Sequence, residues 1–332
     1  MRTRYLAGAG LGLVAAVVFA SATTGPLLVR FILMLVTPLP IALAGLGWGW
    51  RTAVVAGAAG SALLLFASPV VAAAFALTQA VPMAVLTYLA LLSRPLAESG
   101  TPVPNDDANA VEWYPTGRIV VWAAVMAGLI AIAMLMMIGG DVESLRKSLA
   151  DFMKTAIESG LPSADGQAQL SEAEVAALSE VALGMLPAAF ATSWMGSLLL
   201  NLWLAGRVTL ASGQLGRPWP DLAATTYPTG TPLAFGVMLL ATMLAGYPGL
   251  AASAFAGGLF VAYVLLGLAV IHYTTRGLAW RPFALWALYG FLLVVNLWAA
   301  IVIAMLGLAE GVLQLRARAP APPGPPPPHS NT

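Results

Sequence analysis

The feature that most constrains this chain is its series of long stretches without a charged residue. Residues 52–92 contain no Asp, Glu, Lys or Arg, and this run is about twice the roughly 20 residues that one helix needs to cross a bilayer. Ser68-Pro69 interrupts it near the middle, where proline disfavours helical conformation in the preceding residue. The run therefore predicts two spans. Of the whole chain 60% is hydrophobic and 9% charged, outside the usual composition of a soluble domain.

The same reasoning predicts an all-α fold, a polytopic transmembrane helical bundle of about eight to nine spans with a short amphipathic helical insertion. The other spans are expected at residues 6–20, 27–47, 119–138, 186–205, 232–247, a following helix that ends near Tyr273, and 283–308. Four parts result: N-terminal transmembrane helices at 1–138, an acidic amphipathic loop at 139–184, C-terminal transmembrane helices at 185–318, and a disordered Pro-rich tail at 319–332. Pro38-Leu39-Pro40 predicts irregular geometry in the second span.

The distribution of basic residues predicts a cytoplasmic N-terminus, because cytoplasmic loops carry an excess of Lys and Arg. Arg2, Arg4 and the apolar run ending at Ala20 also fit a cleavable signal peptide, but small residues suited to helix packing favour a retained span. Arg316 and Arg318 conflict with an odd number of spans, since nine would place them outside the cytoplasm.

The acidic loop predicts an amphipathic helix at residues 141–158, lying on the membrane surface, because its apolar residues recur at helical spacing. Ser171-Glu172-Ala173-Glu174 resembles a capping box that opens a second short helix. For the acidic loop as a whole, two interpretations are equally favoured: a solvated loop without a specific role, and a lid over a cavity.

Five polar residues are candidates for substrate binding, each with a structural alternative. Gln79, Asn201 and Asn296 could present amides to a cavity or hydrogen-bond neighbouring helices. Arg30 could bind an anion, although snorkelling to the interface is favoured. His272 could relay protons, although an interfacial histidine is favoured.

Several functions are not expected. The chain has no Cys, two His and a net charge of +1, so we expect neither a metal site, a cofactor nor a nucleic-acid partner. It also lacks a P-loop, a His-Glu-x-x-His motif and a Gly-x-Ser-x-Gly elbow. We therefore expect that it is not an enzyme.

Several strings carry a family resemblance. They are Pro38-Leu39-Pro40 with Gly45-Leu46-Gly47-Trp48-Gly49, Glu112-Trp113-Tyr114-Pro115-Thr116-Gly117-Arg118, Asn201-Leu202-Trp203-Leu204-Ala205-Gly206-Arg207, Gly267-Leu268-Ala269-Val270-Ile271-His272, and Leu306-Gly307-Leu308-Ala309-Glu310 followed by Leu315-Arg316. In this order they resemble the YybS-like family of bacterial inner-membrane proteins, domain of unknown function 2232, across nearly the whole chain. That resemblance implies a multi-pass inner-membrane protein and no established activity.

The front part is more distantly similar to the substrate-binding S components of energy-coupling-factor transporters. Ala16 and Ala20 match the Ala-x-x-x-Ala element by which such components dock on their coupling protein. We therefore expect a binding or transport subunit for a small solute, embedded in the lipid bilayer and served by a separate coupling ATPase. The alternative is a non-catalytic scaffold for envelope proteins that uses its Gly/Ala faces and its tail as contact surfaces.

Overall fold

The structure, a computed structural model, describes residues 2–96, 110–158 and 172–318. The expected tail at 319–332 and the first residue of the expected capping box lie outside them. The helices and strands are α1 (Arg2–Ser21), α2 (Leu27–Val36), α3 (Leu39–Trp48), α4 (Trp50–Leu65), α5 (Pro69–Phe75), η1 (Ala76–Ala80), α6 (Val81–Ala90), β1 (Ser93–Pro95), β2 (Val111–Trp113), α8 (Thr116–Ile138), α9 (Val142–Glu158), α10 (Glu172–Ala211), η3 (Leu222–Ala224), α11 (Thr231–Ala241), α12 (Tyr247–Thr274), α13 (Arg281–Val295) and α14 (Leu297–Leu313).

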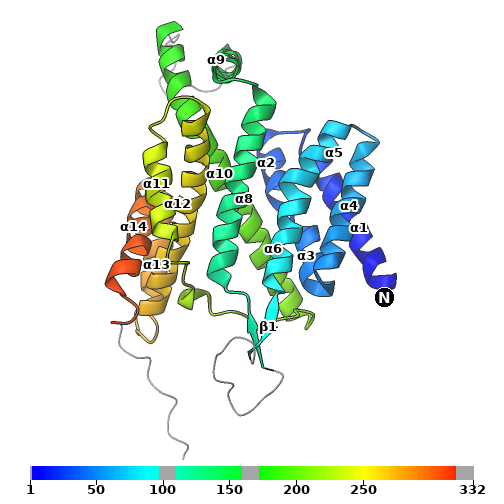
Figure 1. The fold of residues 1–332 in the computed structure, drawn as a ribbon, viewed down its shortest axis with the longest axis vertical. Helices are drawn as coiled ribbons and strands as arrows, with labels where there is room; N and C mark the ends of the chain where they lie inside the picture. The colour runs from blue at the N-terminus through cyan, green and yellow to red at the C-terminus, as the bar shows by residue number, and fades with distance from the viewer. Residues whose placement is uncertain (1, 97–109, 159–171, 319–332) are drawn as a thin grey trace, which may run out of the picture.

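The helices run up and down through one all-α bundle, as predicted (Figure 1). Among the described residues, six helical segments are long and apolar enough to cross a membrane, and four shorter apolar helices, α4, α11, α13 and α14, accompany them. We call the end where Arg51, Arg94, Arg118, Arg207 and Arg276 lie the basic end. The N-terminus lies at this end, and α9 lies across the opposite one (Figure 1).

The N-terminal helices contain the two breaks that proline predicts. One lies at Thr37-Pro38 between α2 and α3, and the other at residues 66–68 between α4 and α5. Small residues then let α1 and α4 approach closely: a Cβ added at Gly12 would lie 1.9 Å from the carbonyl oxygen of Ala56. This is the packing role expected of small residues in membrane helices.

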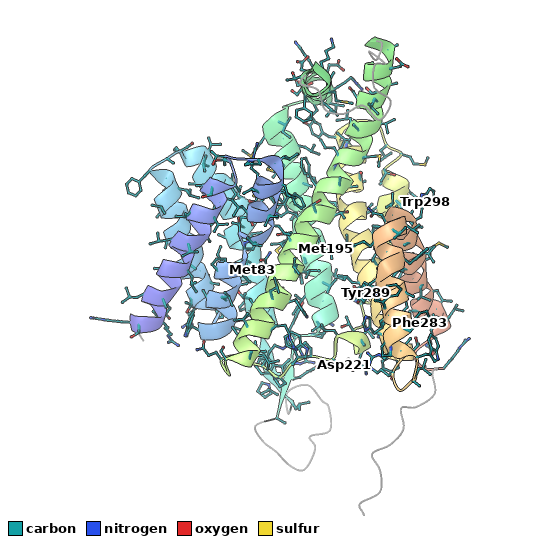
Figure 2. All side chains as sticks on the ribbon, turned by 180° about the vertical axis from the view of Figure 1, so that it is seen from behind. Met83, Met195, Asp221, Phe283, Tyr289 and Trp298 are labelled. Carbon is teal, nitrogen blue, oxygen red and sulfur yellow. The ribbon has the colours of Figure 1, made fainter. Side chains whose placement is uncertain are left out.

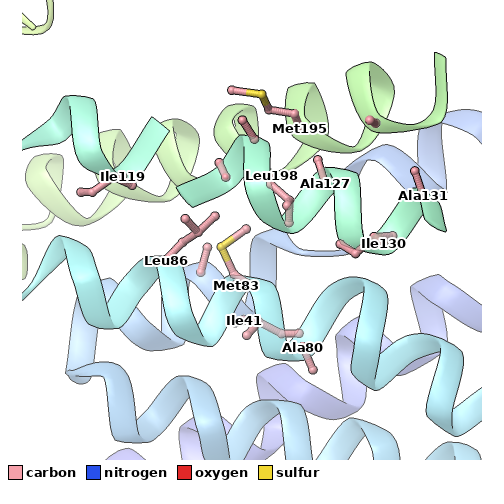
Figure 3. Packing of buried hydrophobic residues seen from close by; sticks show 14 of the residues in the cluster. Ile41, Ala80, Met83, Leu86, Ile119, Ala127, Ile130, Ala131, Met195 and Leu198 are labelled. Atoms are coloured by element: carbon pink, nitrogen blue, oxygen red, sulfur yellow. The ribbon is translucent and has the colours of Figure 1, made fainter. Parts of the chain in front are cut away.

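The core lies where α3, α6, α8 and α10 meet (Figure 3). Ile41, Met83, Leu86, Met195 and Leu198 are all completely buried there. A two-stranded antiparallel ribbon of β1 and β2 follows α6 at the basic end, with Ser93 opposite Trp113.

The acidic loop forms the predicted amphipathic helix, α9. Leu145 on its inner face packs against Leu135 and Leu183, while Phe152 on its outer face is 68% exposed. The expected second short helix is not separate, because residues from Glu172 continue without interruption into the expected sixth span as α10. Pro187 inside α10 does not end it. The prediction of a second, separate short helix from the capping-box pattern was therefore wrong.

The expected seventh span, 232–247, is wrong in length. The helix α11 has 11 residues, which is about 16 Å and roughly half of the hydrocarbon core. Residues 225–228 before it are not helical, and Tyr247 begins α12 rather than ending a span.

The expected ninth span, 283–308, is two helices that reverse at Asn296. Its φ of 49° and ψ of −111° are not helical, and asparagine tolerates positive φ better than most residues. Figure 2 shows Phe283 low on the bundle, Tyr289 above it and Trp298 higher still, so α13 ascends. The helix α14 then descends to the basic end (Figure 1).

This hairpin removes the conflict that Arg316 and Arg318 posed. The Arg316 guanidinium donates through Nη1 to the carbonyl oxygens of Ala223 and Thr225, at 3.0 and 2.9 Å. Those residues belong to the loop that carries Asp221, the partner of Arg276. The C-terminal arginines are therefore at the same end as the N-terminus.

Candidate functional site

A cavity of about 980 Å³ lies between α8, α10, α12, α13 and the loop at 215–227. Its lining along α12 runs from Val261 to His272, which is roughly 16 Å at 1.5 Å per residue. The cavity therefore extends from the basic end to about the middle of the bundle. We call it the basic-end cavity.

Most of the wall of the basic-end cavity is apolar. Leu199, Leu200, Trp203, Leu265 and Leu268 line it from α10 and α12. Three of these side chains are also partly open, with exposed fractions of 40% for Leu200, 45% for Trp203 and 36% for Leu265. Part of this apolar wall is therefore open rather than covered by the neighbouring helices.

The non-helical segment before α11 forms another part of the wall. The Tyr227 hydroxyl donates a hydrogen bond of 2.6 Å to the carbonyl oxygen of Ala262, near the middle of α12. The Tyr227 ring also lies edge-on to that of Tyr263, with centroids 5.9 Å apart. These contacts hold irregular backbone inside the bundle, where membrane proteins tolerate it only if it is buried in protein or lines a cavity.

An ion pair of Asp221 and Arg276 lines the part of the cavity at the basic end, which we call its mouth. Figure 2 shows Asp221 low on the bundle. The Arg276 guanidinium donates through Nη1 to Oδ2 of Asp221 at 2.8 Å, and its Nη2 pairs with Oδ1. The hydrogen bonds from Arg276 lower the pKa of the Asp221 carboxyl below its ordinary value. The same pairing raises the pKa of Arg276, so both groups are charged near neutral pH.

Two further arginines line the cavity without a carboxylate partner among the described residues. Arg217 donates through Nη1 to the carbonyl oxygen of Ala90 at 2.9 Å and lies 5.6 Å from the ring of Trp113. Burial lowers its pKa, but arginine remains protonated in proteins. The Nε atoms of Arg217 and Arg281 are buried and have no hydrogen-bond partner in the described structure. With one carboxylate against three guanidinium groups, the polar part of the cavity carries net positive charge.

His272 is the one predicted site residue that lines the basic-end cavity. Its Nε2 atom lies 2.8 Å from the Tyr289 hydroxyl of α13. This pair joins α12 to α13 across one side of the cavity.

Arg316 holds one segment of the cavity wall in place. Besides its bonds to Ala223 and Thr225, its Nε donates to Oε1 of Glu310 at 2.8 Å, and both side chains are 11% exposed. The end of α14 is thereby tied to two residues that line the cavity.

Gln79 and Asn201 are buried away from the cavity lining. Gln79 is 1% exposed in the π-helical turn η1, and its Nε2 donates to Thr78 Oγ1 at 3.3 Å. Asn201 is completely buried and donates through Nδ2 to the carbonyl oxygens of Leu35 and Ser197, each at 2.7 Å. The bond to Leu35 joins α10 to the last turn of α2, just before the break at Pro38. The side-chain oxygen of each amide has no hydrogen-bond partner among the described residues.

Asn296 and Arg30 lie on the surface. Asn296 is exposed at the reversal between α13 and α14, so it does not form an inward-facing pair with Asn201. Arg30 is exposed near the turn between α1 and α2 and donates through Nε to the Ala22 carbonyl oxygen at 3.3 Å. The five candidates are therefore not brought together.

The acidic helix α9 does not cover the basic-end cavity, because it lies at the opposite end of the bundle (Figure 1). A smaller hollow of about 560 Å³ lies between α9 and α10. Arg146 pairs there with Glu143 and Glu180, and the hydrogen bond that it donates to Glu180 raises the pKa of Arg146.

Sequence reasoning missed Arg217, Asp221 and Tyr227 as cavity residues. The available signal was the composition of the loop at 212–230, which contains Arg217, Asp221 and two aromatic residues, Trp219 and Tyr227, between two apolar helices. Within the described ranges 2–96, 110–158 and 172–318, no group of three or more His, Asp or Glu could hold a metal ion.

Comparison with known proteins identifies a family. The family model described as "Predicted membrane protein (DUF2232)" matches residues 13–309, which is most of the chain and confirms the resemblance to the YybS-like family. No curated protein and no solved structure matches the chain. The similarity to S components stays a prediction; in the structure Ala16 of the Ala-x-x-x-Ala element is completely buried, whereas Ala20 is exposed. The chain belongs to the DUF2232 family of membrane proteins.

Proposed function

We propose that the protein is a membrane-embedded binding subunit for a small solute and that the basic-end cavity is its binding site. The observation that carries this proposal is the cavity itself, whose volume of about 980 Å³ is at the upper end of the usual range for ligand sites. Apolar walls with a few convergent polar groups are the usual composition of such sites.

The discontinuous segment made of the non-helical residues 225–228 and the short helix α11 supports this proposal. Transporters commonly build their binding sites from discontinuous helices, because the irregular backbone exposes polar groups to the ligand. Here the irregular segment contributes Thr225 and Tyr227 to the cavity lining.

We infer that the basic end faces the cytoplasm of a bacterial inner membrane, because cytoplasmic loops are enriched in arginine. The cavity mouth would then open toward the cytoplasm, and α9 would lie on the external surface. This inference differs from the sequence-based expectation of an extracytoplasmic lid over the site.

The proposed role is binding or transport without a chemical step. The chain carries no recognisable motif for ATP hydrolysis, so uphill movement of a solute would require a separate coupling ATPase or another membrane protein as partner.

The test is native mass spectrometry of the purified protein, comparing wild type with Gly196→Trp and Gly236→Trp. Gly196 lines the cavity, and a Cβ built there meets no atom within 4 Å, so an indole can enter the cavity without a backbone clash. Gly236 is an equally open and exposed helical glycine on α11, outside the lining. A retained small molecule should be lost in Gly196→Trp and kept in Gly236→Trp. Equal retention in both variants, or none in the wild type, would refute the proposal and favour a scaffold.

A further inference from the structure

The charges and the open side of the basic-end cavity also indicate what kind of solute it accepts; this inference rests on the proposed binding function. Its polar part holds Arg217, Arg276 and Arg281 against the single carboxylate of Asp221. A desolvated site with unpaired guanidinium groups favours an anionic group, because each guanidinium offers several donors in a fixed plane.

The rest of the cavity favours a hydrocarbon chain rather than a small polar ion. Leu200, Trp203 and Leu265 line the cavity and are partly exposed, so this part of its wall is open. On the other side of this opening, α13 contains no buried residue, and it is joined to α12 by the His272–Tyr289 contact. The hydrocarbon chain of a ligand can therefore lie against this wall, between α10 and α13, and remain in apolar surroundings.

We propose that the ligand is an anionic amphiphile that enters from the bilayer between α10 and α13. Its headgroup, a phosphate or carboxylate, lies against Arg217 and Arg281, which have no carboxylate partner among the described residues. Its hydrocarbon chain lies along Leu200, Trp203 and Leu265. Arg276 remains paired with Asp221 and closes the mouth of the cavity beneath the headgroup.

The experiment titrates the purified protein, in a neutral maltoside detergent, with three probes: dodecyl phosphate, zwitterionic dodecylphosphocholine and inorganic phosphate. Binding is read by native mass spectrometry. The variants are Arg217→Gln with Arg281→Gln, the cavity-filling Gly196→Trp, and Arg51→Gln as a matched control, since Arg51 lies at the same end but outside the lining.

The expected result is that dodecyl phosphate binds at least about tenfold more tightly than either other probe, because a charge-assisted hydrogen bond contributes enough for such a ratio. The double arginine variant should lose about tenfold or more in affinity, Gly196→Trp should abolish binding, and Arg51→Gln should match wild type.

Other outcomes overturn the inference in distinguishable ways. If dodecylphosphocholine binds as well and only Gly196→Trp weakens it, the cavity binds amphiphiles without selecting an anion, and the proposed function survives. If inorganic phosphate binds as tightly as dodecyl phosphate, the ligand is a soluble anion rather than an amphiphile. If Gly196→Trp changes the binding of no probe, both the inference and the proposed function fail.

Discussion

Substituting Gly267 with alanine tests how the C-terminal hairpin is attached to the bundle. The helices α12 and α14 cross at Gly267 and Gly307. A Cβ added at Gly267 would lie 1.9 Å from the carbonyl oxygen of Ile303, and one added at Gly307 would lie 2.3 Å from that of Tyr263. Ordinary contact begins near 3.4 Å, so Gly267→Ala must separate the two backbones by roughly 1.5 Å.

The energetic cost comes from lost packing rather than from the hydrophobic effect, because lipid tails are as apolar as the surfaces that separate. Overpacking of a close contact typically costs about 1–3 kcal/mol. Ala299, Ile303 and Ala304 are buried in the same seam, and a small separation reduces the dispersion contacts of all of them. We therefore expect the free energy of unfolding to fall by about 1–3 kcal/mol.

The assay is equilibrium unfolding in mixed micelles, followed by tryptophan fluorescence, with Gly236→Ala as the control. Gly236 has open space around its Cβ position, and alanine is preferred to glycine in helices by roughly 0.5–1 kcal/mol. The control should therefore be neutral or slightly stabilised. If Gly267→Ala unfolds at the same denaturant concentration as Gly236→Ala, the close crossing of α12 and α14 is refuted.

Three further predictions concern the cavity wall, its mouth and the topology. Tyr227→Phe removes the hydrogen bond to α12, so stability should fall by about 0.5–1.5 kcal/mol and hydrogen exchange in residues 225–230 should rise; unchanged exchange would contradict the anchoring role. The lowered pKa of Asp221 means that its pairing with Arg276 stabilises the fold above the ordinary pKa of 3.8 and is lost as pH falls below it. Because both side chains are more than a third exposed, the free energy of unfolding of the wild type should exceed that of Asp221→Asn by only about 0.2–1 kcal/mol at neutral pH. A difference that does not shrink as the pH falls below 3.8 would contradict this assignment. Since the chain has no Cys, single cysteines at Thr24 and Arg318 should react with an impermeant maleimide from opposite sides of the membrane; labelling from one side would contradict the hairpin.

Sequence patterns predicted the bundle well wherever helix ends coincide with proline or charge. Ser68-Pro69 and Pro38 mark real breaks, because proline cannot donate a helical hydrogen bond and restricts the residue before it. The reversal at Asn296 has neither signal. Its flanking residues are uniformly apolar, so hydropathy alone is equally consistent with one long span.

The candidate site was less predictable, because its residues come from segments far apart in the chain. Polar residues inside spans were selected as candidates, yet Asn201 donates its amide to the neighbouring backbone, and Asn296 lies at a helix reversal. Arg217 and Asp221 lie outside the predicted spans, so this criterion did not select them. Their role depends on how the loop at 212–230 folds back into the bundle, and that arrangement leaves no periodic pattern in the sequence.

Electron cryomicroscopy of the wild-type protein with dodecyl phosphate, in nanodiscs of zwitterionic lipid, tests the central claim that the basic-end cavity binds the ligand. The account predicts elongated density between α10 and α13, with its headgroup next to Arg217 and Arg281 and its chain along Trp203. A map in which α10, α12 and α13 close on one another, with no cavity and no density between them, would contradict it.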